Sequence, residues 1–164
     1  MSNIKIMDDV LANKIAAGEV VEKTMNVVKE LVENSIDAES SIISIELIDS
    51  GVKEIKVTDN GKGMDKNDAK LAFSRHATSK LTDVEDLFNI ESLGFRGEAL
   101  PSIAAVSNVS LKTSDGKNGT LVTISGGKDL KVESADLQDG TTITVRDLFY
   151  NTPVRLKYLK NLYV

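Results

Sequence analysis

Acidic and amide side chains gather on one side of a predicted helix early in the chain. Apolar residues between Thr24 and Ala38 recur at the helical period, which predicts a helix with one apolar face. At about 100° per residue, four polar residues fall within a single arc on another side of this helix. These residues are Glu30, Glu33, Asn34 and Asp37. The arc is a candidate site for chemistry, although most polar faces of amphipathic helices are simply solvated.

Two glycine-containing segments are the other candidates. Segment 59–64, Asp-Asn-Gly-Lys-Gly-Met, follows a predicted strand, and its two glycines permit a tight turn or the close approach of a ligand. Segment 94–100, Gly-Phe-Arg-Gly-Glu-Ala-Leu, leads into a predicted helix, so its backbone N–H groups could converge on a phosphate. The chain contains neither GxxxxGK[ST] nor GxGxxG, the two commonest nucleotide-binding signatures. From the residues alone, each segment is either a plain turn or loop or a ligand site.

The composition excludes several classes of function. The 164 residues fit one domain with a sizeable core. With no cysteine and one histidine, the chain cannot form disulfides, thiol nucleophiles, thiolate zinc sites or multi-histidine metal sites. A net charge of -5 gives no basic field over the whole surface for nucleic acid or anionic membranes. No apolar run approaches the roughly 20 residues that span a bilayer, so we expect a cytoplasmic protein without a membrane partner.

The remaining pattern predicts one continuous domain that combines helices and strands. The predicted helices cover 24–38, 65–73, 82–88, 98–106 and a segment that starts at Pro153, and the predicted strands cover 43–47, 55–57, 109–113, 120–125, 130–133 and 141–145. Residues 92–97 are predicted to form a loop. Pro101 is compatible with the fourth helix only within its first turn, where the amides have no intrahelical partner.

The combination and order of these segments resemble one protein family. The matching segments are 11–21, 28–38, 59–63, 75–80, 94–100 and 147–153. They resemble the N-terminal ATPase region of the MutL mismatch-repair family, within the GHKL superfamily of type II topoisomerases, sensor histidine kinases and large heat-shock chaperones. The strings GFRGEAL and DLFYNTP are specific to MutL and its relatives. We therefore expect residues 1–164 to be one GHKL ATP-binding subdomain, without the transducer domain of the family.

The resemblance implies an α/β fold, an α+β two-layer sandwich of the GHKL (Bergerat) type. Helices would cover one face of a mixed, largely antiparallel sheet, with ATP between the helices and a mobile lid. Asp59 would accept a hydrogen bond from the exocyclic amine of adenine, while Gly61 and Gly63 let backbone and base approach closely. By the same resemblance, Asn34 is a ligand of Mg²⁺. Glu30 is the general base that deprotonates the attacking water.

Further ATP contacts are implied along the chain. Backbone N–H groups of 96–100 would cradle phosphates, and residues 78–80 would add hydroxyl and ammonium contacts as the lid closes. Thr142 would support adenine through a water molecule. The full additional set is Met64, Thr78, Ser79, Lys80, Gly94, Phe95, Arg96, Gly97, Glu98, Ala99, Leu100 and Thr142.

The resemblance also implies an ATP-driven switch in DNA mismatch repair. ATP would close the lid and favour a homodimer, in which residues 15–21 make contact. The full protein would answer a MutS-like mismatch-recognition protein and bind DNA weakly, through parts largely outside this chain. The transducer domain supplies a lysine to the γ-phosphate, so we expect this chain alone to bind Mg·ATP but to hydrolyse it slowly or undetectably. Two alternatives stay open: a non-catalytic nucleotide-binding or interaction module, and another GHKL enzyme such as a sensor kinase.

Three positions depart from the family pattern. Lys23-Thr24 replaces the usual Arg-Pro, so we expect Thr24 to cap the first helix. Glu39 replaces a glycine, which costs roughly 1 to 3 kcal/mol if this position needs a positive φ. Pro101 replaces an alanine and stiffens the start of its helix. None of the three removes an implied ligand contact.

Overall fold

The computed structural model describes residues 21–74 and 99–162. Its elements, in chain order, are α2 (Thr24–Asp37), β1 (Ile43–Ile48), the 3-10 turn η1 (Asp49–Gly51), β2 (Glu54–Asp59), α3 (Lys66–Leu71), α5 (Ala99–Ala105), β3 (Asn108–Ser114), β4 (Gly119–Ser125), β5 (Lys128–Ala135), β6 (Thr141–Arg146) and α6 (Pro153–Leu162). The helices and strands predicted within these ranges are confirmed, with small shifts at their ends. The helix predicted at 82–88 and the loop predicted at 92–97 lie outside the described residues.

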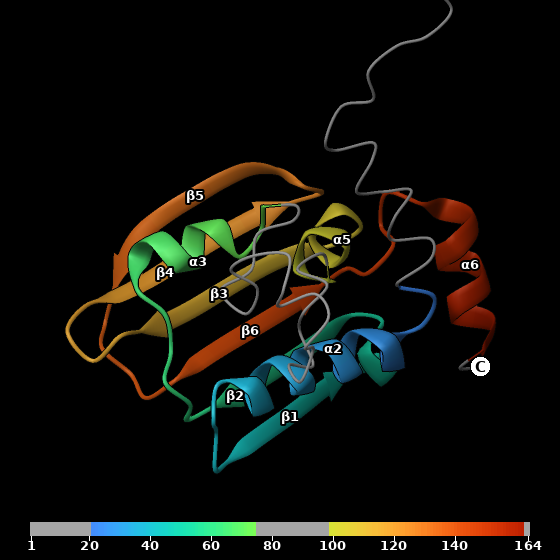
Figure 1. The fold of residues 1–164 in the computed structure, drawn as a ribbon. Coiled ribbons are helices and arrows are strands. Elements are labelled where there is room, and N and C mark those ends of the chain that lie inside the picture. The colour runs from blue at the N-terminus through green and yellow to red at the C-terminus, as the bar shows by residue number, and fades with distance from the viewer. Residues whose placement is uncertain (1–20, 75–98, 163–164) are drawn as a thin grey trace, which may run out of the picture.

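The strands form one six-stranded sheet in the order β1-β2-β6-β3-β4-β5. Every pairing is antiparallel, so the described sheet is more regular than the mixed sheet that we expected. Helices α2, α3 and α5 lie on one face of the sheet, and the opposite face carries no described helix (Figure 1). The two-layer α+β sandwich is therefore confirmed.

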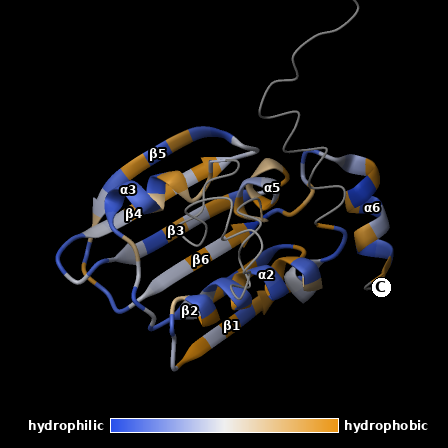
Figure 2. Ribbon diagram, viewed as in Figure 1, coloured by the Kyte–Doolittle hydropathy of each residue, from blue (hydrophilic) through white to orange (hydrophobic). Residues whose placement is uncertain are grey.

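Two rows of apolar side chains across the strands form the sheet's half of the core. Paired positions place Val57, Ile143, Leu111 and Val122 in one row, and Ile55, Val145, Val109 and Ile124 in the next. All eight are buried. Figure 2 shows the alternation of hydrophobic and hydrophilic residues along the central strands that produces this one-sided face. Helix α2 adds Val27 and Leu31 from above, and each such burial contributes about 1.5 to 3 kcal/mol.

A third row at one end of the same face is polar. Thr113 pairs with Thr141 on β6 and with Thr120 on β4, and all three threonines are buried. Asp59, the last residue of β2, is also buried and receives a hydrogen bond from the Thr141 backbone N–H. Buried polar groups that are this close to a hydrophobic core need partners or a ligand, so this end of the sheet is where a site is expected.

The turn between β3 and β4 holds these two strands in register. The Asp115 carboxylate accepts hydrogen bonds from the backbone N–H groups of Asn118 and Lys117, both at 2.8 Å. These bonds, that from Asn118 first, lower the pKa of Asp115 below its ordinary value, because they favour the ionised carboxylate. The turn thereby fixes the end of β3, where Thr113 lies.

Helix α2 starts at Thr24, as expected, but with a different capping residue. The N-cap is Lys23, not Thr24, and Thr24 is the first helical residue. Instead of a cap side chain, Asn26 reaches back and accepts a hydrogen bond from the Lys23 backbone N–H at 2.8 Å. The Thr24 prediction is therefore wrong, because Asn26 already satisfies an N–H group at the helix start and Thr24 is buried against the core.

Helix α2 ends in a Schellman motif that lacks the usual glycine. The Ser40 N–H donates to the Ser35 carbonyl, and the Glu39 N–H donates to the Ile36 carbonyl. This geometry places Glu39 at φ 62°, in the left-handed region. Glu39 thus has the positive φ on which the expected strain depended.

In the described part of the chain, α5 runs from Ala99, and Pro101 is its third described residue. That Pro101 lies in the first turn of the helix stays a prediction, because the residues before Ala99 lie outside the described ranges. Within the residues that the structure describes, no helix has the length and apolar character needed to cross a membrane.

Candidate functional site

The Asp59 carboxylate is the centre of the polar row. Its Oδ1 accepts hydrogen bonds from the backbone N–H groups of Gly61 at 2.9 Å and of Thr141 at 3.2 Å. Its Oδ2 accepts the hydroxyl proton of Ser35, on α2, at 2.7 Å. A carboxylate offers about four lone-pair directions, so these three donors leave one acceptor direction open, on Oδ2. Asp59 can therefore accept one further hydrogen bond from a ligand.

The neighbouring threonines form a second hydrogen-bonded group. Thr113 Oγ1 accepts the Met64 backbone N–H at 3.0 Å and lies 2.8 Å from Thr141 Oγ1. Thr113 is fully buried, whereas Thr141 retains a small exposed fraction. These contacts join the loop after β2 to the end of β3 and the start of β6. Met64, an expected ATP contact, is thus tied to the same group through its backbone.

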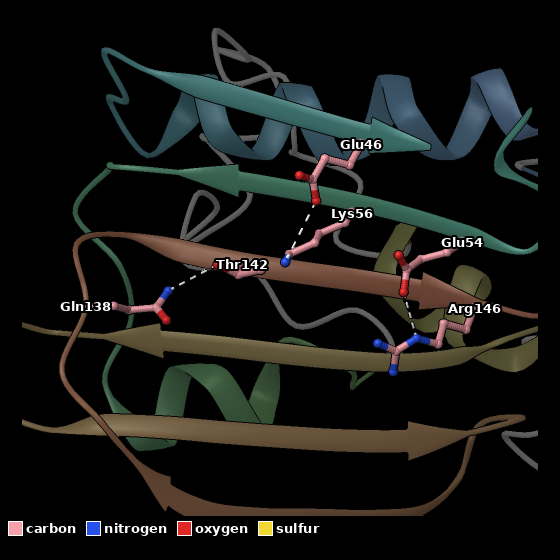
Figure 3. Close-up of polar contacts among 6 residues, drawn as sticks. All are labelled: Glu46, Glu54, Lys56, Gln138, Thr142 and Arg146. Atoms are coloured by element: carbon pink, nitrogen blue, oxygen red, sulfur yellow. Dashed lines mark hydrogen bonds and ion pairs between the residues drawn. The ribbon is translucent and has the colours of Figure 1, made fainter. Parts of the chain in front are cut away.

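Thr142, which we expected to support adenine, lies on the opposite face of the sheet. It pairs with Thr58 and Lys112, whose side chains alternate with the core-facing residues. Figure 3 shows Thr142 on the face away from the helices, where Gln138 Nε2 donates to its hydroxyl at 3.4 Å. The ion pairs Lys56–Glu46 and Arg146–Glu54 lie on this face as well, at 3.8 and 2.8 Å (Figure 3).

Thr141 lies at this candidate site and was not among the predicted contacts. A shift of one residue along a strand moves the side chain to the other face, and Thr141 lies on the face of Asp59. The alternation of side chains could have identified Thr141, because Ile143 and Val145 face the core and residues two apart on a strand lie on the same face. Ser35 lies on the apolar face of α2 by helical period, and a hydroxyl group on such a face is itself a sign of a buried partner.

The two glycines after Asp59 are required by close approach to the protein's own backbone. A Cβ at Gly63, whose φ is +68°, would lie 1.8 Å from the Ser114 carbonyl oxygen. A Cβ at Gly61 would lie 2.6 Å from the Ala38 carbonyl oxygen. These contacts pack the loop after β2 against α2 and the end of β3, so the expected approach of a base to these glycines stays a prediction.

Glu30 and Asn34 lie one turn apart on α2, on the flank of the helix beside its buried stripe. Asn34 directly precedes Ser35, so it lies at the Asp59 end of the helix, and Glu30 lies one turn toward the N-terminus. Of the acidic neighbours in the same arc, Glu33 forms an ion pair with Lys29 at 4.0 Å. Both Glu30 and Asn34 are partly exposed, as a residue that meets a ligand must be.

The expected phosphate-binding segment is described only at its end. Ala99 and Leu100 form the first residues of α5, on the same face of the sheet as α2 (Figure 1). The other expected contacts lie outside the described residues: Thr78, Ser79, Lys80, Gly94, Phe95, Arg96, Gly97 and Glu98. The structure therefore connects Asp59 and Met64 through the threonines of the polar row and joins Asp59 to α2 through Ser35, whereas the contacts of Glu30, Asn34 and the phosphate segment with ATP stay predictions.

The donor set suits a magnesium ion that is held mainly by phosphate and water. In the described ranges, no cluster of three acidic or histidine side chains could form an all-protein metal cage. Mg²⁺ keeps several waters and needs only one or two protein oxygens when a substrate phosphate is present. The amide oxygen of Asn34, on a partly exposed helix flank, fits that requirement.

A family model matches most of the chain. Residues 22–151 match the family described as histidine kinase-, DNA gyrase B- and HSP90-like ATPase. The match includes every described residue of the site, from Glu30 to Thr141.

Curated relatives with high identity are DNA mismatch repair proteins. The chain is 57% identical over 164 residues to the DNA mismatch repair protein MutL of Geobacillus sp. (strain WCH70), covering 99% of this chain and 26% of that protein. It is likewise 57% identical to the protein of the same name from Streptococcus agalactiae serotype III, of which it covers 25%. The chain thus spans about a quarter of the length of the curated relatives that it matches.

Solved structures of related proteins have the same fold. The N-terminal domain of a DNA repair protein has a TM-score of 0.76 and 31% identity, covering 93% of this chain and 44% of that chain. The Aquifex aeolicus MutL ATPase domain, solved in complex with ADP, has a TM-score of 0.65 and 32% identity. That match covers 88% of this chain and 51% of the Aquifex chain.

Proposed function

Because the chain belongs to the histidine kinase-, DNA gyrase B- and HSP90-like ATPases, and within them to the MutL family, we propose that it binds and hydrolyses ATP in DNA mismatch repair. The observation that carries this proposal is the Asp59 carboxylate, held by three donors with one acceptor direction open. A buried, oriented carboxylate of this kind suits an amine donor such as the exocyclic group of adenine.

The adenine end of the site lies between α2 and the polar row. The open direction of Asp59 Oδ2 accepts one N–H of the exocyclic amine, and Thr141, whose backbone N–H donates to Oδ1 of the same carboxylate, is its neighbour in the row. The ADP complex of the Aquifex relative supports this choice of ligand class. The base would thereby be fixed at one end, with the phosphates directed to segment 96–100.

The chemistry belongs to the exposed flank of α2. Glu30 accepts the proton of the attacking water, and a carboxylate one helical turn from the metal ligand suits this role of general base. Asn34 contributes its amide oxygen to the Mg²⁺ site, and Mg²⁺ when bound neutralises charge on the phosphates. The N–H groups of segment 96–100 would hold the phosphates, with residues 78–80 added on lid closure.

The switch is the part of the proposal that extends beyond this chain. ATP binding would close the lid and promote a homodimer, and the whole protein would respond to a MutS-like partner and contact DNA. The names of the curated relatives support a role in mismatch repair, while this chain spans about a quarter of their length. Turnover by this stretch alone is accordingly expected to be slow or undetectable.

A split between binding and turnover tests the proposed catalytic role. We compare Glu30→Ala with the parent sequence, both joined to the remaining part of a MutL relative so that turnover is measurable. Glu30→Ala should lower the rate of phosphate release by about 10²- to 10⁴-fold, the usual contribution of a general base. Binding of a non-hydrolysable ATP analogue should change little, because the base does not hold the nucleotide.

Two results would speak against this role. If Glu30→Ala keeps full turnover, Glu30 is not the base. If the parent chimera binds the analogue but releases no phosphate, the chain is a nucleotide-binding module without catalysis.

A further inference from the structure

We propose that Ser35 and Thr113 are positioning residues that set the selectivity for adenine, each through a different partner. Ser35 acts through Asp59 on the exocyclic amine, and Thr113 acts through Thr141 on the ring nitrogen N1. This inference rests on the proposed ATP site and deepens it. Ser35 is 3% exposed and Thr113 is fully buried, so both act from behind the residues that face the ligand.

Ser35 restricts the Asp59 carboxylate to one free acceptor direction. Two backbone N–H groups occupy Oδ1, and Ser35 occupies one direction of Oδ2. An ionised carboxylate can only accept, so Ser35 must donate its proton to Asp59. The remaining direction on Oδ2 is therefore an acceptor with a fixed orientation, matched to a single N–H donor.

Thr113 sets the direction of the Thr141 hydroxyl proton. Thr113 Oγ1 accepts the Met64 N–H, and its own proton has two acceptors within reach. Thr141 Oγ1 lies at 2.8 Å, whereas the Gly140 carbonyl oxygen lies at 3.4 Å. Either hydroxyl of this pair could donate to the other, and because the 2.8 Å contact is the shorter one, we assign the Thr113 proton to Thr141. The Thr141 proton is then left to point at a ligand acceptor.

The resulting pair of groups is complementary to one purine edge. The edge of adenine presents an amine donor beside the N1 acceptor, and the polar row offers an acceptor on Asp59 and, by the assignment above, a donor on Thr141, whose backbone N–H contacts the same carboxylate. Guanine presents a carbonyl oxygen beside an N1–H donor, the reverse order. Buried polar groups that are left without a partner are costly, so the site rejects guanine.

Two ATP analogues test the contact with the amine and the contact with N1 separately. Purine riboside triphosphate lacks the amine, and 1-deaza-ATP lacks the N1 acceptor. We measure the Kd of the parent chain, Ser35→Ala and Thr113→Val for ATP, both analogues and GTP. Each variant serves as the matched control for the other, and Thr113→Ser restores the hydroxyl.

The proposal predicts a crossed pattern. Ser35→Ala should raise the Kd for ATP and for 1-deaza-ATP by about tenfold, a typical loss for a hydrogen bond to a charged group. It should leave the Kd for purine riboside triphosphate unchanged. Thr113→Val should raise the Kd for ATP and for purine riboside triphosphate by about fivefold and leave the Kd for 1-deaza-ATP unchanged. Thr113→Ser should bind as the parent does. Both Ser35→Ala and Thr113→Val should narrow the preference for ATP over GTP.

Other outcomes overturn the inference in distinguishable ways. If a variant binds all four ligands more weakly by the same factor, the replaced residue only stabilises the fold. If ATP binding is unchanged in both variants, neither Ser35 nor Thr113 is a positioning residue. Both results overturn this inference alone, since the parent still binds ATP. If the folded parent chain binds no ATP, the proposed function fails as well.

Discussion

At the scale of single residues, the site depends on backbone approaches that only glycine permits. The loop after β2 must pass over the end of β3 for Met64 to donate to Thr113. Gly63 makes this possible, because any side chain there would overlap the Ser114 carbonyl. The sequence predicted a close approach at this loop, and the partner is the protein's own strand.

Gly63→Ala should therefore destabilise the fold by more than about 3 kcal/mol, since backbone strain and steric overlap add. Gly116→Ala is the matched control, because Gly116 has φ +90° but a Cβ added there would meet no atom within 4 Å. It should cost only about 1 kcal/mol. Urea unfolding of both variants measures the difference, and equal losses would show that the overlap with Ser114 is relieved without cost.

At the scale of elements, the strand β6 shows what the sequence could predict about the site. Alternation predicted its limits well, because Ile143 and Val145 are core residues at period two. Which of Thr141 and Thr142 faces the helices depends only on the alternation of side chains along the strand, and the resemblance pointed to Thr142, which lies on the face opposite Asp59. Hydrogen bonds across the strands, such as that from Thr141 to Asp59, come from pairing between distant segments and have no local signal.

Replacement of these two threonines tests the assignment of faces. Thr141→Val should weaken ATP binding by about fivefold, because it removes one hydroxyl from the polar row. Thr142→Val should leave ATP binding unchanged, because this side chain lies on the opposite face. Calorimetric titration of both variants with ATP measures the two affinities. A loss confined to Thr142→Val would reverse our assignment.

The end of helix α2 offers a test of stored strain. Glu39 occupies the left-handed position of the Schellman motif at φ 62°, where glycine is the favoured residue. Glu39→Gly should raise the free energy of unfolding by about 1 kcal/mol, since relief of the strain exceeds the entropy that glycine adds to the unfolded chain. Thermal unfolding should show a rise of about 2 to 4 °C.

Glu39→Gln is the control for charge, because it removes the carboxylate but keeps the Cβ. It should unfold close to the parent temperature. If Glu39→Gln gains as much as Glu39→Gly, the cost at this position is electrostatic and the backbone carries little strain.

At the scale of the whole molecule, the sheet divides its helix-facing side into a core and a site. Two rows of apolar residues hold the layers together, and the third row keeps Asp59, Thr113 and Thr141 buried but hydrogen-bonded. Helix α2 joins the two regions, because Leu31 packs in the core and Ser35 donates to Asp59. Stability and the proposed ligand binding thus depend on the same antiparallel register.

The central claim is that this row binds the adenine of ATP through Asp59. The most direct measurement is calorimetric titration of the chain with Mg²⁺ and a non-hydrolysable ATP analogue, repeated on Asp59→Asn. The asparagine oxygen can still accept from Gly61 and Thr141, but its amide group then faces the adenine amine, donor against donor.

We predict saturable binding by the parent chain and no detectable binding by folded Asp59→Asn. Equal binding by both proteins, or no binding by a demonstrably folded parent chain, would contradict the account.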